Sequence, residues 1–135
     1  MTEHRSVQSI AALAGVAFVL IGILGFVPGI TTHYGSMSFA GHGSGARLLG
    51  VFQVSILHNL VHLAFGVAGL VLAKTADGAR KFLFGGGAVY LALWVIGLVG
   101  AAKWVPSNTA GDWAHFAFGV ALVGLGVVAR RRSIA

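Results

Sequence analysis

The sequence predicts an all-α membrane protein, a bundle of four transmembrane helices built as two tandem helical hairpins. Three observations predict it: the composition, four long apolar segments, and a histidine-containing phrase that recurs 53 residues later. Of the 135 residues, 57% are hydrophobic and 9% are charged, whereas soluble domains carry about 25% charged residues. Such a chain has more apolar side chains than its own core can bury, so lipid must cover the rest.

The four apolar segments account for most of the chain and comprise residues 7–27, 48–73, 82–102 and 113–129. A helix needs about 20 residues to cross a hydrocarbon core of about 30 Å. We therefore expect one transmembrane domain over residues 1–135, with no room for a separate soluble domain.

The ends of these segments carry helix-terminating signals. Pro28 and Gly29 end the first segment, because proline disfavours helix at the residue before it. The loop 29–47 is rich in glycine and serine and is expected to be mobile or closely folded, without a further structural layer. Segment 48–73 is longer than the bilayer core requires, so it should tilt or project outward. Asp112 is expected to cap the fourth helix.

A repeat predicts that the two hairpins are similar. Residues 62–68 and 115–121 are identical at six of seven positions, and residues 21–25 resemble residues 96–100 at an offset of 75. Both hairpins would then have the same orientation, related by a pseudo-two-fold axis along the membrane normal.

The basic residues follow an orientation rule. Seven of them fall on one side of a four-span topology and two on the other; the seven are Arg5, Lys74, Arg80, Lys81, Arg130, Arg131 and Arg132, and the two are Arg47 and Lys103. This excess predicts that both termini are cytoplasmic. Basic residues interleaved with aromatic residues are lacking, which argues against nucleic acid as a partner. The absence of cysteine excludes disulfides and thiolate metal sites.

Histidines within the apolar segments are the candidate site. His58 and His62 lie four residues apart on one helix face, and His115 is the repeat equivalent of His62. In one interpretation all three hold the helices together through hydrogen bonds. In a second, His62 and His115 ligate haem b, with Gly66 and Gly119 leaving room for the porphyrin.

A third interpretation is a copper or zinc site formed by His58, His62 and His115, with Asp112 as a further ligand or an orienting group. Proton relay is a fourth. A hydrolytic triad is disfavoured, because no acid lies within the apolar segments beside these histidines.

The chain also resembles a family of small four-helix membrane proteins of actinobacteria and related bacteria, classed as a domain of unknown function. The resemblance rests on residues 26–29, 48–53 and 58–63, with the His-Asn-x-x-His segment its most specific part. It implies a multi-pass protein of a bacterial plasma membrane and supplies no activity. The expected role is that of a non-enzymatic accessory subunit, in contact with lipid and with other membrane subunits or a second copy. The alternative is a haem- or metal-binding redox protein.

Overall fold

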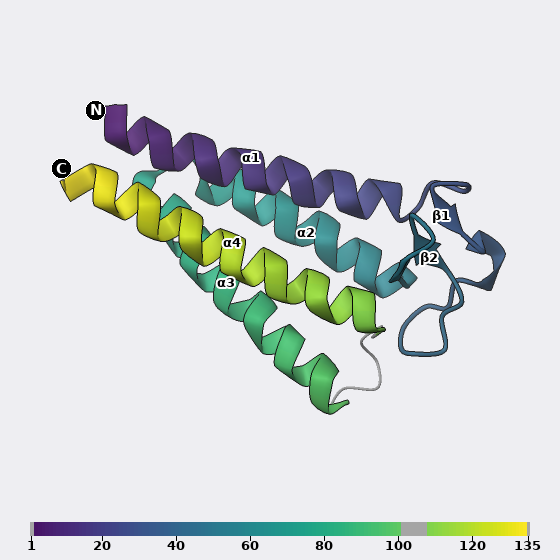
Figure 1. Cartoon of the computed structure of the whole chain (residues 1–135). Coiled ribbons are helices and arrows are strands. Elements are labelled where there is room, and N and C mark those ends of the chain that lie inside the picture. Colours follow the sequence, from purple (N-terminus) through teal and green to yellow (C-terminus); the bar gives the residue numbers. More distant parts are fainter. Residues whose placement is uncertain (1, 101–107, 135) are drawn as a thin grey trace.

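The computed structural model describes residues 2–100 and 108–134 and confirms a mostly helical bundle (Figure 1). The four helices are α1 (Thr2–Leu24), α2 (Ile56–Leu72), α3 (Ala76–Val99) and α4 (Thr109–Ile134). Both termini lie at one end of the bundle, and the segment between α1 and α2 lies at the other (Figure 1). The basic Lys103 and the expected end of the third segment, Ala102, lie outside the described residues.

The helices pack mainly as two hairpins, α1 against α2 and α3 against α4. The short turn from α2 to α3 is closed by Thr75, whose hydroxyl accepts a hydrogen bond from the Gly78 amide at 3.0 Å. Gln8 near the start of α1 donates to the carbonyl of Lys74 in this turn at 2.7 Å. At the opposite end, α3 stops at Gly100, whose φ of 64° is a left-handed conformation that favours glycine.

The helix α2 begins eight residues later than the expected segment 48–73, at Ile56. Residues before it form a small antiparallel sheet, in which β2 (Arg47–Leu48) pairs with both β1 (Thr31–Thr32) and β3 (Phe52–Gln53). A 3-10 turn, η1 (Tyr34–Ser36), follows β1. With 17 residues, α2 is about 25 Å long. This length removes the need for a long tilted or projecting span.

The segment 25–55, here called the cap, is therefore a folded layer and not a plain loop. Ser44 Oγ donates to the carbonyl of Val54, and the Gln53 side chain donates to the carbonyls of His42 and Ser44 at 2.8 Å each. Val54 and Leu48 form a small apolar core with Ala46. The expectation that this region adds no structural layer is wrong, because side-chain bonds to backbone organise a sequence that lacks strand-like alternation.

Equivalent glycine contacts join the helices of the two hairpins. A Cβ added to Gly15 of α1 would lie 2.8 Å from the carbonyl oxygen of Gly66, and one added to Gly87 of α3 would lie 3.0 Å from that of Gly119. Small residues let helix backbones approach this closely in a membrane bundle. Gly66 of α2 and Gly119 of α4 occupy equivalent positions 53 residues apart, as the repeat indicated. Gly15 of α1 and Gly87 of α3 are also equivalent, but they are 72 residues apart, since 87 − 15 = 72. The sequence offset of 75 is thus wrong by three residues, close to one helical turn.

An aromatic cluster fills the centre of the bundle, and its members are related by the same offsets. Phe18 of α1 stacks on Tyr90 of α3 with ring centroids 5.1 Å apart. Each of them meets the phenylalanine of its own hairpin edge-on, at 4.8 Å for Phe65 and 5.7 Å for Phe118. Since 90 − 18 = 72 and 118 − 65 = 53, the two hairpins contribute matching halves to one core.

The outer helix surfaces are apolar, and this identifies the chain as a multi-pass integral membrane protein. Three helices are long and apolar enough to cross a membrane, in the ranges 6–24, 76–99 and 109–130, and α2 is a shorter apolar helix. Large exposed side chains on these surfaces include Leu13, Leu20, Val67 and Val89. Exposed apolar surface on this scale is expected to face lipid acyl chains.

Candidate metal centre

Two helix starts position the histidines. Ser55 caps α2, with its hydroxyl accepting from the His58 amide at 3.1 Å. Asn108 does the same for α4, accepting from the Gly111 amide at 2.9 Å. Because 108 − 55 = 53, the two N-cap residues are equivalent. His62 and His115 each lie seven residues beyond the N-cap residue of their own helix. Both imidazoles are therefore carried to the same depth of the bundle by the same local structure.

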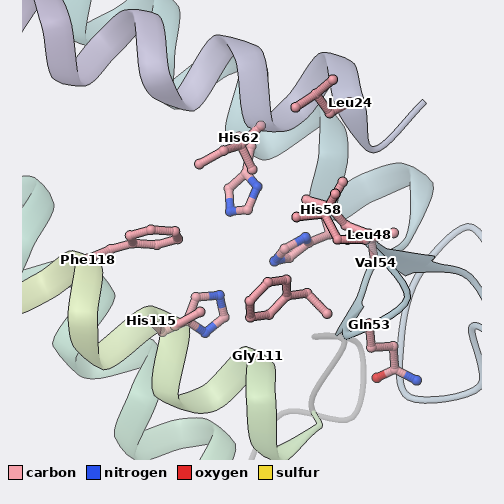
Figure 2. Close-up of a pocket in the computed structure, with 13 residues that line it drawn as sticks. Leu24, Leu48, Gln53, Val54, His58, His62, Gly111, His115 and Phe118 are labelled. Carbon is pink, nitrogen blue, oxygen red and sulfur yellow. The ribbon is translucent and has the colours of Figure 1, made fainter. Parts of the chain in front are cut away.

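The three imidazoles converge where α2 and α4 face each other below the cap. One ring nitrogen of each of His58, His62 and His115 lies within 4.8 Å of the corresponding atom of the other two. The His58 ring is 4.2 Å from that of His62 and 5.8 Å from that of His115, measured between centroids. Figure 2 shows the three side chains directed toward a common space.

That space is a cavity of about 340 Å³. Its walls come from α1, α2, α4 and the cap, and apart from the three histidines and Gln53 they are apolar (Figure 2). The lining residues are Ile21, Leu24, Leu48, Leu49, Phe52, Gln53, Val54, His58, His62, Gly111, Ala114, His115 and Phe118. No acidic side chain is among these described lining residues, so the imidazoles are the only titratable groups that face the cavity.

Each of the three imidazoles carries a buried nitrogen without a hydrogen bond. Within the described part of the chain, the Nδ1 atoms of His58, His62 and His115 have no hydrogen-bond partner. A buried polar atom left unpaired costs free energy comparable to a lost hydrogen bond, so native structures satisfy nearly all of them. Three such atoms in one cluster are available to bind a metal ion or to donate a hydrogen bond.

The expected porphyrin space beside Gly66 and Gly119 is occupied by protein. A Cβ added to Gly66 would lie 2.6 Å from the backbone of Gly15 and Val19, and one added to Gly119 would lie 2.7 Å from the Leu91 side chain. Both glycines thus serve contacts within their own hairpins and stay outside the cavity. The structure brings the three histidines together and separates the two glycines from them.

Asp112 lies against α3, away from the cavity. It is buried, and its carboxylate faces Gly97, where an added Cβ would collide with it. In the other hairpin, Asn59 takes the equivalent place against Gly25. Asp112 is not one of the residues whose ligand atoms form the cluster. Nor does it cap α4 as expected, because Asn108 holds that position four residues earlier.

The sequence also contains an N-cap signal for α4. Asn108 precedes Thr-Ala-Gly-Asp, and an asparagine in front of a helical segment favours an N-cap. Its side chain also donates to the carbonyl of Val51 at 2.8 Å, which ties α4 to the cap. The cap residues of the cavity wall, such as Phe52 and Val54, carry no pattern that indicates a ligand site.

Residues 8–128 match the family described as a domain of unknown function, DUF4383, and the chain therefore belongs to that family. No curated protein matches the chain, and no solved structure does. The family description supplies no activity.

Proposed function

We propose that this DUF4383 protein is a membrane metalloprotein that binds one divalent transition metal through His58, His62 and His115. The observation that carries the proposal is the convergence of three buried imidazoles, each with an unpaired Nδ1 atom, from two helices. Neutral imidazole is a ligand for zinc, copper, nickel and iron.

The ligand set supports zinc or copper in particular. Zinc–nitrogen bonds are about 2.0–2.1 Å long, so tetrahedral ligand atoms are separated by about 3.3 Å. The three ring nitrogens lie within 4.8 Å of one another. The distance between two of them must therefore shorten by up to about 1.5 Å to reach the tetrahedral spacing. Rotation of the imidazoles about χ1 and χ2 supplies such a movement without a change in the helices. Three protein ligands leave a fourth position open, as in zinc sites that bind substrate or water.

Haem is supported less well than a metal ion. A porphyrin held between His62 and His115 would extend sideways from the iron, and the His58 ring lies within 6 Å of both these rings. The His58 ring would therefore lie in space that the porphyrin needs. The glycines that might have widened the space are filled by α1 and α3.

Two further expectations stay predictions. One is that both termini are cytoplasmic in a bacterial plasma membrane, with the cap and the metal site toward the outside. The other is that the chain serves as an accessory subunit of a larger membrane assembly. A metal-binding role is compatible with both, since a small membrane subunit can hold a metal for a partner.

The test is the metal content and affinity of the protein purified in maltoside detergent, stripped with chelator and reloaded with zinc or copper. We expect one ion per chain, and a loss of affinity of at least about 100-fold for each of His58→Ala, His62→Ala and His115→Ala. His42→Ala is the matched control, because this exposed cap histidine uses only its backbone carbonyl in the structure. Equal affinity in all four variants would contradict the proposal. A Soret band in the wild-type protein that is absent from His62→Ala would show that the site binds haem and not a metal ion alone.

A further inference from the structure

The wall of the cavity suggests what occupies the open position on the metal, and this inference rests on the proposed metal site. We infer that the site binds a monocarboxylate with a hydrocarbon body, whose carboxylate completes the metal coordination and whose chain fills the apolar cavity.

Charge favours an anion. Three neutral imidazoles leave a divalent ion with its full positive charge, and burial of an uncompensated charge is strongly unfavourable. No carboxylate lines the described cavity wall, and the Asp112 side chain faces Gly97 on α3. Asp112 is buried and interacts electrostatically with His115, so it can offset one of the two positive charges, and a monocarboxylate ligand would supply the second negative charge. A carboxylate oxygen is an ordinary zinc ligand, with a bond of about 2.0–2.2 Å.

The wall chemistry favours a hydrocarbon body. Ile21 and Leu24 of α1 face Ala114 and Phe118 of α4 across the cavity, and the cap closes it with further apolar side chains such as Val54. Ligand sites typically combine a mainly apolar wall with a few polar groups that fix orientation. Here the polar groups are the three imidazoles and Gln53, whose amide nitrogen donates to the carbonyls of His42 and Ser44. The imidazoles lie together at one place in the wall, so a ligand with one polar end fits.

Size limits the length of the chain. The cavity volume is about 340 Å³, equivalent to about eleven water-sized groups of roughly 30 Å³ each. Octanoate, with about ten non-hydrogen atoms, is a suitable probe. Each buried methylene group contributes roughly a fourfold increase in affinity, so octanoate should bind much more tightly than acetate.

The experiment uses the cobalt(II)-loaded protein in maltoside detergent at pH 8, where the visible absorption of cobalt reports its coordination. We expect octanoate to change this spectrum with an affinity at least about 100-fold higher than that of acetate. Octanol, which has the same chain but no charge, should leave the spectrum unchanged. Octanoate binding no better than acetate, or an equal response to octanol, would overturn the inference.

Two variants assign the effect to the cavity. Ala114→Leu fills the cavity and should abolish the preference for octanoate, while cobalt binding and the acetate response remain. Ala117→Leu is the matched control, because Ala117 is exposed on the same helix and outside the cavity wall. If Ala114→Leu does not fold, Leu24→Phe fills the cavity from α1 and must give the same loss. Octanoate preference retained in the folded, filled variant overturns the inference.

The two proposals fail in different ways. Failure of the wild-type protein to bind cobalt overturns the metal site, and the ligand inference with it. Cobalt bound through the three histidines, without selectivity for octanoate, overturns the ligand inference alone.

Discussion

His62 and His115 occupy the same position in two successive hairpins, seven residues beyond the N-cap residues Ser55 and Asn108. The equivalence ends one turn earlier, where His58 in the first hairpin corresponds to Gly111 in the second. Both line the cavity. His58 supplies the third imidazole, and the missing side chain at Gly111 leaves space beside it. The candidate site thus arises where two similar hairpins differ.

Metal binding is expected to stabilise the folded protein. At a free zinc concentration about 100 times the dissociation constant, the stabilisation amounts to about 2.7 kcal/mol if zinc binds only the native state. Thermal unfolding in detergent should therefore shift upward with zinc in the wild type, and chelator should reverse the shift. His62→Ala should show no shift, and a shift of equal size in this variant would exclude the cluster as the binding site.

The contact between Gly66 and α1 is expected to tolerate no side chain. Gly66→Ala would place a Cβ 2.6 Å from the Gly15 backbone, and overpacking of this kind costs about 1–3 kcal/mol. The unfolding midpoint in detergent measures the loss. Gly124→Ala on α4 is the control, since its added Cβ meets nothing within 4 Å. We expect the control to be neutral or stabilising, as alanine favours helix over glycine. Equal losses would argue against the close packing of α1 on α2.

The aromatic centre is expected to carry much of the stability. Phe18 is 3% exposed and contacts rings from the other three helices, including Tyr90, Phe65 and Phe118. Phe18→Ala should reduce the free energy of unfolding by about 3–5 kcal/mol through the cavity that it creates. Leu13→Ala removes a lipid-facing side chain that is 71% exposed on the same helix and should cost far less. The prediction fails if both variants lose stability equally.

The N-terminus of α4 is expected to depend on Asn108 for its stability. Asn108→Ala removes the bond to the Gly111 amide and the bond to the carbonyl of Val51. Loss of an N-cap costs about 0.5–2 kcal/mol, and detachment of the cap segment should also weaken zinc binding. Asn108→Asp keeps the acceptor for Gly111 and loses the donor to Val51, so its effect should be intermediate. An unchanged unfolding midpoint in Asn108→Ala would contradict the role of this residue.

The orientation can be tested by cysteine labelling, because the chain has no cysteine of its own. Gly35→Cys lies in the cap at an open position, whereas Lys74→Cys lies in the exposed turn between α2 and α3. In intact cells, a maleimide that cannot cross the membrane should label Gly35→Cys and not Lys74→Cys. The reverse pattern would place the termini outside and contradict the distribution of basic residues.

The helical bundle was predictable, since apolar segments long enough to cross a membrane specify helices whatever their detailed packing. The repeat also placed His62 and His115 at equivalent positions, and the structure brings them together. The cap was not predictable, because its strands of two residues each are organised by bonds such as Gln53 to His42 that leave no periodic pattern. Gly66 was misassigned for a related reason: a small residue indicates close approach, but the sequence cannot say whether a helix or a ligand approaches.

The most direct test of the account is X-ray absorption spectroscopy of the zinc-loaded protein in detergent. We expect three imidazole nitrogens at about 2.0–2.1 Å and one further light ligand. Each of His58→Ala, His62→Ala and His115→Ala should weaken the imidazole scattering, because it removes one of the three rings, and His42→Ala should leave it unchanged. A spectrum without imidazole scattering, or one that these three substitutions leave unchanged, would contradict the assignment of this cluster as a metal centre.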